Sequence, residues 1–231
     1  MSDLELSVII PAYLEEENLR VILPRLSKVL HDLNAPYEVL VIDTMQSMDN
    51  TSQVCMENGA IYMNRENGNY YGDAVRTGIK SAKGQWIIFM DADGSHSPEF
   101  IKELYQYRNE YDVVIASRYV KGGGSDNSPL LKLMSYLVNV TFSVFFRLGC
   151  RDVSNSFKLY RATLLKDLKL ASNNFDVIEE MLIKLKRKNR NIRFKEVPFF
   201  FKERMFGHTK RNLLMFILSY LGVMLRLMFM K

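Results

Sequence analysis

The chain has 231 residues, a length that suits one domain with a sizeable hydrophobic core. Hydrophobic residues make up 48% and charged residues 25%, which are globular values. The net charge is +5, and basic residues gather in the C-terminal third beside apolar segments. This distribution favours an anionic membrane surface or a phosphate ligand and excludes nucleic acid as the expected partner.

The two cysteines, Cys55 and Cys150, have neither metal-ligand spacing nor the number needed for a disulfide framework. They are expected to be reduced core thiols, as in a cytosolic protein. Leu6 to Ile10 follows acidic residues and predicts a first strand rather than a signal peptide.

Strands and helices alternate through the first 118 residues, which predicts right-handed βαβ units and a mostly parallel, Rossmann-like α/β sheet flanked by helices. Pro24 inside the first helix predicts a kink or a late start. The expected strands are Leu6–Ile10, Tyr37–Ile42, Ala60–Met63, Trp86–Met90 and Asp112–Ala116, and the expected helices are Glu15–Leu33, Asp49–Asn58, Tyr70–Ala82 and Pro98–Asn109.

After residue 118 the pattern changes to a glycine-rich loop followed by apolar and polar segments in turn. The expected elements are an apolar helix over 129–148, a strand Asp152–Tyr160, an amphipathic helix Phe175–Lys188, a strand Ile192–Phe201, a polar loop Glu203–Lys210 and a second apolar helix Leu213–Met230.

Neither apolar helix is a convincing membrane span, because a span needs roughly 20 uninterrupted apolar residues. Lys132 and Arg147 bracket the first helix, and Arg226 lies inside the second. Both helices are expected to lie at a bilayer surface with their basic side chains reaching towards the head groups. Core helices or an oligomer interface are the alternatives.

Two carboxylates, Asp91 and Asp93, follow the apolar run Trp86–Met90. This run is too short for a helix and too apolar for an exposed strand, so it predicts a central buried strand. Its carboxyl end is where an open α/β sheet binds ligands. Buried acids need a partner, and a divalent cation that bridges them to a phosphate supplies one. On this stretch alone, an acidic turn that caps a helix is an equal alternative.

The ends of three predicted strands, at Pro11, Asp43 and Asp91, are expected to line one edge of the sheet. That edge forms a crevice of nucleotide size. The first βα turn lacks G-x-G-x-x-G, and the chain has no G-x-x-x-x-G-K-[ST] loop, so neither an ordinary dinucleotide site nor a P-loop ATPase is supported.

Five short motifs occur in the order of a known family, at Val8–Leu19, Asp91–Asp93, Ala116–Gly123, Asp152–Lys158 and Glu196–Lys210. The chain resembles the family 2 inverting glycosyltransferases of the GT-A fold. Within that family it is similar to the polyprenyl-phosphate sugar synthases, of which dolichol-phosphate mannose synthase is the best-known branch. The match covers nearly the whole chain.

The resemblance implies one GT-A domain over 1–231, with a nucleotide-sugar half at 1–118 and an acceptor half at 119–210. The apolar segments 129–148 and 211–231 would lie on the membrane surface. The implied activity is metal-dependent transfer of a hexose, of mannose or glucose type, from a GDP- or UDP-sugar to a polyprenyl or dolichyl phosphate, with inversion and with Mg²⁺ or Mn²⁺ as cofactor. The expected location is cytoplasmic, peripheral on the inner face of the membrane, with a membrane-anchoring partner or a homo-oligomer as further partners.

The resemblance and the chemistry of the residues assign four roles. Asp91 and Asp93 bind the metal, because the departing diphosphate must be neutralised. The catalytic residues are Asp91, Asp93, Arg118 and Asp152. The nucleotide sugar contacts Pro11, Ala12, Tyr13, Glu15, Asp43, Asp91, Ala92 and Asp93, and the acceptor phosphate contacts Arg118, Lys158, Arg204 and Lys210.

Several assignments have alternatives. An ionised lipid phosphate needs cations rather than a base, whereas a sugar hydroxyl needs a carboxylate base. Asp152 is the main candidate for that base, with Glu179 or Glu180 behind it, although a solvated helix face is the favoured expectation for both glutamates. Asp91 alternatively pairs with Arg65 or Arg76, and His96 is either a metal ligand or a polar residue at a helix start.

Three positions depart from the family pattern. Thr44 follows Asp43 where a second acid is usual, Ser95 stands where the mannose synthase branch often has glutamine as a metal ligand, and Asn155-Ser156 replaces Ser-Gly. The base and the completeness of the metal coordination therefore stay open. Two alternative functions are transfer to a sugar hydroxyl in cell-surface polysaccharide or glycolipid synthesis, and a catalytically weakened nucleotide-sugar or membrane-binding module.

Overall fold

The computed structural model describes residues 4–206 and 222–229. A seven-stranded sheet in the order β3-β2-β1-β4-β7-β5-β8 forms its centre, with a separate pair of short strands, β6 and β9. The strands are β1 (Leu6–Pro11), β2 (Tyr37–Asp43), β3 (Ile61–Asn64), β4 (Trp86–Phe89), β5 (Val113–Ser117), β6 (Gly124–Ser125), β7 (Lys158–Arg161), β8 (Phe194–Pro198) and β9 (Phe200–Phe201).

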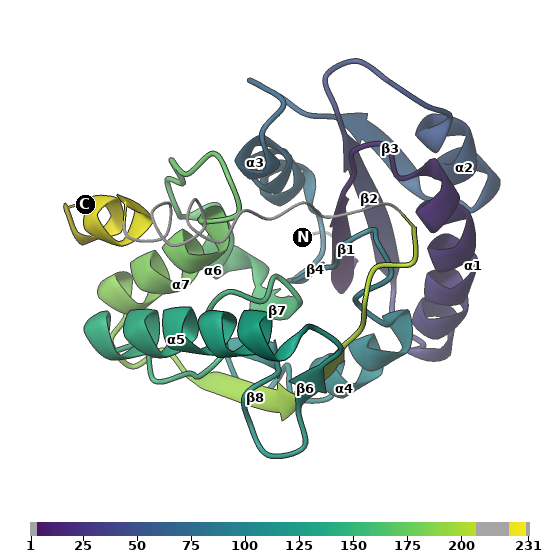
Figure 1. Ribbon diagram of the computed structural model, residues 1–231. Coiled ribbons are helices and arrows are strands. Elements are labelled where there is room, and N and C mark those ends of the chain that lie inside the picture. Colours follow the sequence, from purple (N-terminus) through teal and green to yellow (C-terminus); the bar gives the residue numbers. More distant parts are fainter. Residues whose placement is uncertain (1–3, 207–221, 230–231) are drawn as a thin grey trace.

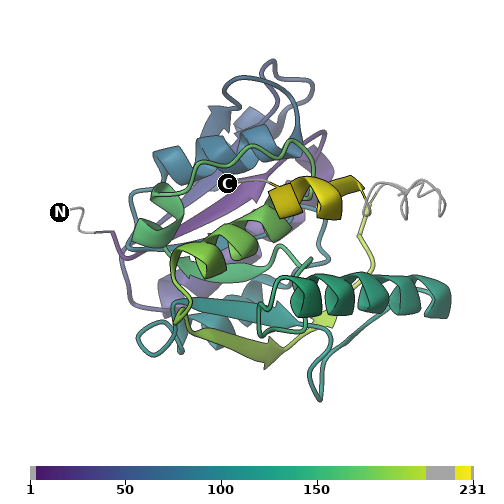
Figure 2. The same cartoon turned by 90° about the vertical axis from the view of Figure 1, so that its left-hand side faces the viewer.

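Helices cover both faces of the sheet, so the fold has three layers (Figures 1 and 2). Figure 1 shows α1 and α2 on one side and α3, α6 and α7 on the other. The helices are α1 (Glu16–Asp32), α2 (Thr51–Glu57), α3 (Tyr71–Ser81), α4 (Ile101–Tyr105) after a 3₁₀ turn Pro98–Phe100, α5 (Pro129–Phe145), α6 (Ala162–Lys166) and α7 (Val177–Lys188).

The central strands are apolar on both sides because each face of the sheet carries its own core. Along β1, the side chains of Val8 and Ile10 belong to the core that includes α1 and α2, whereas Ile9 belongs to the core that includes α3 and α7. All four residues of β4 are buried, and β4 lies in the middle of the sheet, as its apolar run predicts. Cys55 and Cys150 are buried free thiols, also as expected.

The position of the crevice follows from the order of the strands. β1 pairs in parallel with β2 on one side and with β4 on the other, so the chain changes direction across the sheet between β1 and β4. Such a switch point leaves a gap at the carboxyl ends of the two strands, where ligands bind in open α/β sheets. Residues that directly follow β1 and β4 therefore face the same space.

The prediction of a mostly parallel sheet is confirmed, with one antiparallel strand, β7, between β4 and β5. The expected strand Asp152–Tyr160 is wrong over its first half, because only Lys158–Arg161 joins the sheet. Asp152, Asn155 and Ser156 are buried polar residues whose side chains bond to other loops, so this stretch forms a turn instead of a ladder.

Other boundaries also differ from those expected. The helix predicted at Pro98–Asn109 ends at Tyr105, and the strand predicted at Ile192–Phe201 is two strands separated at Phe199. The first helix has no late start, because α1 begins at Glu16 and contains the exposed Pro24. Because proline has no backbone N–H, one carbonyl group of the preceding turn lacks its helical hydrogen bond. On this exposed side of the helix, that carbonyl group is close to water. Of the predicted helix Leu213–Met230, the structure describes residues 222–229, and these are helical. The rest of that prediction lies outside the described residues.

We predict that Gly72→Ala destabilises the fold. The Gly72 amide donates to the Asn173 carbonyl oxygen at 2.7 Å, and a Cβ at residue 72 would lie 2.1 Å from the Ser172 carbonyl oxygen. Overpacking of this kind costs about 1–3 kcal/mol, so thermal unfolding followed by circular dichroism will show a midpoint lowered by several degrees. Gly222→Ala is the control, because no atom lies within 4 Å of its added Cβ. Equal midpoints for the two variants would contradict this packing.

Candidate functional site

A cavity of about 740 Å³ opens at the carboxyl ends of β1 and β4. This volume lies within the range of small-molecule sites. Most of the predicted site residues meet there, although they come from distant parts of the chain. The cavity is lined by Pro11, Ala12, Tyr13 and Glu15 after β1, by Asp91, Ala92 and Asp93 after β4, and by Arg118 and Arg204.

Hydrogen bonds from three directions fix Asp91. Its backbone N–H donates to Nδ1 of His96 at 3.0 Å, and its Oδ1 accepts from the Ser156 hydroxyl at 3.0 Å and the Tyr71 hydroxyl at 3.4 Å. Neither of the arginines proposed from the sequence is among these partners. A carboxylate that accepts hydrogen bonds from two hydroxyl groups has a defined orientation towards the cavity.

His96 lies two residues before the 3₁₀ turn Pro98–Phe100, as the second of the two sequence alternatives predicts, and both of its ring nitrogens are engaged in hydrogen bonds, which disfavours the role of metal ligand. It is fully buried, and its ring stacks on Phe157 with 4.7 Å between centroids. Because Nδ1 accepts from Asp91, the proton is on Nε2 and is donated to Oδ1 of Asn155 at 3.0 Å. Burial lowers the pKa of His96, which favours the neutral ring that this arrangement requires. His96 thus positions the turn that carries Asp91.

Asp93 has one carboxylate oxygen fixed by Ser95. The Ser95 hydroxyl and backbone N–H both donate to Oδ1 of Asp93, at 2.6 and 3.0 Å. The second oxygen, Oδ2, lies 3.6 Å from Nε of Arg204. Ser95 is fully buried and its hydroxyl is engaged by the carboxylate, so it orients Asp93 instead of lining the cavity.

The segment after β9 crosses the acidic turn. The Met205 amide donates to the Asp93 carbonyl oxygen at 2.8 Å, and Arg204 donates to Oε1 of Glu15 at 3.1 Å. Gly94 has a φ of +80°, and a Cβ there would lie 2.6 Å from the Met205 side chain, so glycine permits this close approach. Arg204 therefore places a positive charge close to both Glu15 and Asp93.

The donor set fits a divalent cation that binds together with a phosphate ligand. In the part of the chain that the structure describes, no group of three or more His, Cys, Asp or Glu is arranged to hold a metal. Asp91 and Asp93 offer two carboxylates on one cavity wall. Mg²⁺ typically binds through one or two carboxylates plus substrate phosphates and water, and carboxylate oxygens also suit Mn²⁺.

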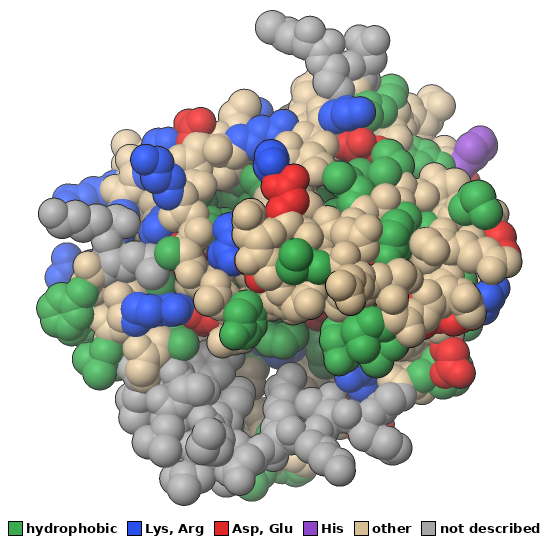
Figure 3. All heavy atoms as spheres, turned by 90° about the horizontal axis from the view of Figure 1, so that it is seen from above, with side chains coloured by type: hydrophobic (Ala, Val, Ile, Leu, Met, Phe, Trp, Pro, Cys, Tyr) green, Lys and Arg blue, Asp and Glu red, His purple; other side chains and the backbone are tan. Residues whose placement is uncertain are grey.

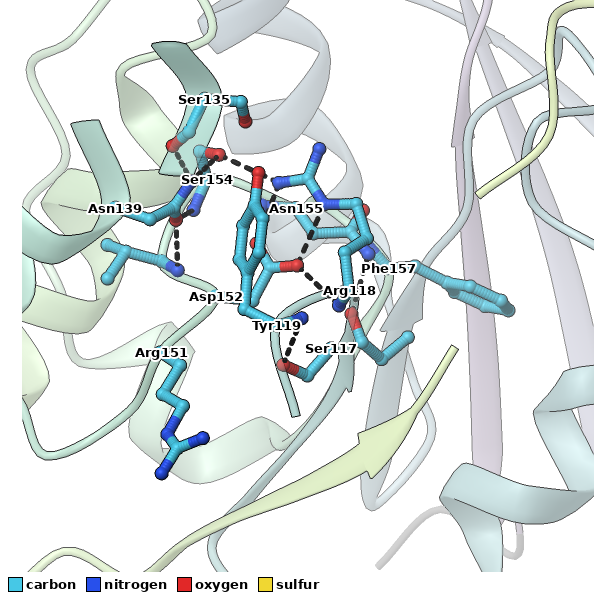
Figure 4. A network of polar contacts seen from close by, with 12 residues as sticks. Ser117, Arg118, Tyr119, Ser135, Asn139, Arg151, Asp152, Ser154, Asn155 and Phe157 are labelled. Atoms are coloured by element: carbon cyan, nitrogen blue, oxygen red, sulfur yellow. Dashed lines mark hydrogen bonds and ion pairs between the residues drawn. The ribbon is translucent and has the colours of Figure 1, made fainter. Parts of the chain in front are cut away.

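Arg118 and Asp152 form a buried ion pair beside the cavity (Figure 4). Nε of Arg118 donates to Oδ2 of Asp152 at 2.8 Å, and an NH2 group donates to Oδ1 at 2.7 Å. Burial raises the pKa of Asp152, but the charge and hydrogen bonds of Arg118 outweigh it and hold the pKa below its usual value. Asp152 is thus ionised, and both of its carboxylate oxygens accept hydrogen bonds from Arg118. This arrangement disfavours the role of general base considered from the sequence.

Lys158 and Asp43 do not line the cavity. The Lys158 ammonium is fully buried and donates to the carbonyl oxygens of Val153 and Asn155, so it holds the turn before β7 and its position does not support phosphate binding. Asp43 is buried at the end of β2 and accepts from the Tyr62 hydroxyl at 3.1 Å, and burial raises its pKa. Lys210 lies outside the described residues.

The expectation that Glu179 and Glu180 lie on a solvated face is wrong, because both are buried. Glu180 accepts from the backbone N–H groups of Ala171 and Ser172 and pairs with Lys184 at 2.9 Å. These bonds shape the loop that brings Asn174, Phe175 and Asp176 to the cavity.

Sequence reasoning missed several residues of the site. Tyr71 supports Asp91 and stacks on Phe175 with 4.2 Å between ring centroids. Arg65 donates to the carbonyl oxygens of Ala12 and Asn69 and so fixes the loop after β1. Ser156 lies in a recognised motif, which was a usable signal, whereas nothing local marks Tyr71 or Phe175.

Comparisons with known proteins agree with this geometry. Residues 7–169 match the family described as Glycosyl transferase family 2. The chain is 33% identical over 215 residues to the dolichol-phosphate mannosyltransferase of Pyrococcus furiosus, covering 90% of this chain and only 59% of that relative's length. It is 29% identical to the undecaprenyl-phosphate mannosyltransferase of Micrococcus luteus, covering 88% of this chain and 86% of the relative.

Among solved structures, the fold is similar to glucosyl-3-phosphoglycerate synthase from Mycobacterium tuberculosis in complex with Mn²⁺, UDP and glucosyl-3-phosphoglycerate. The TM-score is 0.72 with 18% sequence identity, and the match covers 96% of this chain and 79% of that one. The same synthase was also crystallised with Mg²⁺ and UDP. The likeness confirms the expected GT-A architecture.

We predict that Asp152→Ala costs far more stability than Asp167→Ala. Removing one partner of a buried pair leaves an uncompensated charge and costs about 3–5 kcal/mol. Asp167 forms an exposed pair with Lys188, and such pairs contribute less than about 1 kcal/mol. Urea unfolding measures both losses. A cost for Asp152→Ala no greater than that of its control would show that the buried pair does not hold the site together.

Proposed function

Because the chain belongs to glycosyl transferase family 2, we propose that it transfers a hexose from a nucleoside-diphosphate sugar to a polyprenyl phosphate, with inversion. One observation carries the proposal. A single cavity combines two carboxylates, an arginine held by a buried partner, and an apolar wall from α5. The relatives named for dolichol and undecaprenyl phosphate support the same acceptor class.

The donor diphosphate is proposed to lie against Asp91 and Asp93, with Tyr13 and Glu15 lining the same cavity. A bound Mg²⁺ or Mn²⁺ would neutralise the charge of the diphosphate as it leaves. The protein holds the two carboxylates through Ser95 and Ser156 and the Asp91 backbone through His96, so little reorganisation is needed when the donor binds.

The acceptor phosphate is proposed to bind at Arg118, whose guanidinium lines the cavity while Asp152 fixes its orientation. An oxygen of the ionised phosphate attacks the anomeric carbon, and the bond from that carbon to the donor phosphate breaks. No proton has to be removed, so no general base is required. This agrees with the use of Asp152 as the partner of Arg118, and it makes transfer to a sugar hydroxyl the less supported alternative.

The lipid part of the acceptor is proposed to approach along α5. Leu131 and Met134 of α5 line the cavity, and the outer face of the helix exposes further apolar side chains. Lys132 and Arg147 near its ends suit anionic head groups.

Figure 3 shows Lys and Arg side chains gathered on the side of the molecule where α7 lies. Among the described residues, no helix is long and apolar enough to cross a bilayer. We therefore place the enzyme peripherally on a membrane surface.

A donor panel tests the proposed function. GDP- and UDP-linked mannose and glucose are incubated with Mn²⁺ and either farnesyl phosphate or simple sugar acceptors, with Asp93→Asn as the inactive control. The expected product is a sugar phosphodiester that mild acid cleaves, formed only with the lipid phosphate. An acid-stable glycoside formed only with the sugar acceptors would overturn the proposal, and nucleotide binding without any transfer would support the catalytically weakened module instead.

We predict that Leu133→Gln combined with Leu137→Gln weakens binding to phosphatidylglycerol vesicles at least tenfold. Burying one leucine side chain contributes about 1.5–3 kcal/mol, and both side chains are more than half exposed on α5. Vesicle sedimentation measures the loss. Met56→Gln on α2, at a side chain that is 75% exposed, is the matched control and should bind as the wild type does. Equal binding by all three proteins would place the membrane surface elsewhere.

A further inference from the structure

Helix α5 exposes most of its apolar side chains to solvent. Of its 17 residues, all of which the structure describes, only Asn139 and Phe142 are buried. Its exposed side chains are mostly apolar and include Leu130, Leu131, Leu133, Tyr136, Leu137, Val140, Val144 and Phe145. A helix on the surface of a globular protein normally shows the opposite pattern. The buried contacts of α5 with the rest of the protein therefore come from one amide and one aromatic ring. Partly exposed side chains add to them, such as the Tyr136 ring, which lies 5.6 Å from that of Tyr119 between centroids.

The Asn139 amide is fully satisfied. Nδ2 donates to the Ser135 carbonyl oxygen at 2.7 Å and to the Ser154 hydroxyl at 2.9 Å, and Oδ1 accepts from the backbone N–H groups of Val153 and Ser154 at 2.6 and 2.9 Å. An asparagine side chain has two donor hydrogens and two acceptor lone pairs, and here all four are used. Three of these bonds reach the turn that carries Asp152.

The same turn connects Asn139 to Arg118. The Ser154 hydroxyl that accepts from Asn139 also accepts from the Arg118 guanidinium at 3.0 Å, and Figure 4 shows these side chains converging from α5 and from the end of β5. Two of the groups that support Arg118 are thus the carboxylate of Asp152 and the hydroxyl of Ser154. The second support belongs to a turn whose backbone α5 holds.

We propose that Asn139 is a positioning residue that couples the docking of α5 on a lipid surface to the placement of the Arg118 guanidinium in the phosphate site. This inference rests on the proposed function and deepens it. When the outer face of α5 is buried in a bilayer, the helix is fixed. The Asn139 amide then holds Val153 and Ser154, and Ser154 holds Arg118. Without a surface to hold α5, Asn139 and Phe142 are the only buried residues by which this fully described helix is attached.

Two variants separate this coupling from a merely structural role. Asn139→Ala leaves the N–H groups of Val153 and Ser154 without their acceptor, whereas Ser154→Ala removes only the hydroxyl between Asn139 and Arg118. Both should raise the KM for farnesyl phosphate by about tenfold, as misplacing a hydrogen bond to a charged group implies, with the KM for the donor unchanged. In the double variant, the rise in the KM for farnesyl phosphate should be smaller than the product of the two single rises, because both substitutions break the same connection.

Phe142→Leu is the matched control. It weakens the packing of the same helix one turn further on but leaves the amide in place, so it should lower the unfolding midpoint without changing the ratio of the two KM values. If Asn139→Ala shifted both KM values equally, or the double variant showed full additivity, the coupling would be refuted.

Hydrogen exchange gives a readout that does not need turnover. Phosphatidylglycerol vesicles should slow amide exchange at Val153 and Ser154 in the wild type and in Phe142→Leu, but not in Asn139→Ala. If this pattern holds while the wild type transfers no sugar to farnesyl phosphate, the proposed function fails and the coupling stands. If the wild type transfers sugar but vesicles leave exchange at these amides unchanged, the coupling fails and the proposed function stands.

Discussion

The buried pair between Arg118 and Asp152 is the interaction on which the rest of the site depends. Asp152 also accepts from the Asn155 amide at 3.2 Å, and Asn155 accepts from His96, which in turn accepts from the Asp91 amide. The position of the acidic turn is thus linked to the ion pair through consecutive hydrogen bonds. A charge pair this deeply buried persists only where all its remaining groups have partners.

The partners of Asp152 come from separate elements. Its own amide donates to Oε1 of Glu196 in β8, and the Ser117 hydroxyl at the end of β5 donates to the same oxygen. The ion pair therefore joins β5, β8 and the turn before β7 at the edge of the sheet that holds the cavity. Low dielectric strengthens each of these bonds and makes the loss of any single one expensive.

Local pattern and motif were enough to predict the part of the cavity wall that follows β1 and β4. The short apolar run before Asp91 predicted a central strand, and the switch in strand order then brings Pro11 and Asp91 to one edge. The sequence also predicted that Arg118 lies in the same site. These residues directly follow strands, where the direction of the chain is set by the sheet.

The errors concern buried polar residues whose hydrogen-bonding partners lie in turns and loops that strand or helix periodicity does not reveal. Glu180 was expected in water because helical periodicity cannot reveal the N–H groups of Ala171 and Ser172 that compensate for its burial. Lys158 was expected at a phosphate, yet it turns inward to carbonyl oxygens. Asn139 is a polar residue in an apolar helix, and nothing in its sequence context indicates the turn to which it bonds. In each case the hydrogen-bonding partner, rather than the residue type, decides the orientation.

These features support one account, in which a nucleotide sugar and a lipid phosphate meet in a single cavity whose apolar wall is α5. The most direct measurement is photo-crosslinking with a polyprenyl phosphate that carries a diazirine on its first isoprene unit, in the presence of Mn²⁺ and a nucleoside diphosphate. The account predicts labelling of Leu131 or Met134, which line the cavity on α5. Sugar transfer to this lipid with labelling confined to surfaces outside the cavity would contradict it.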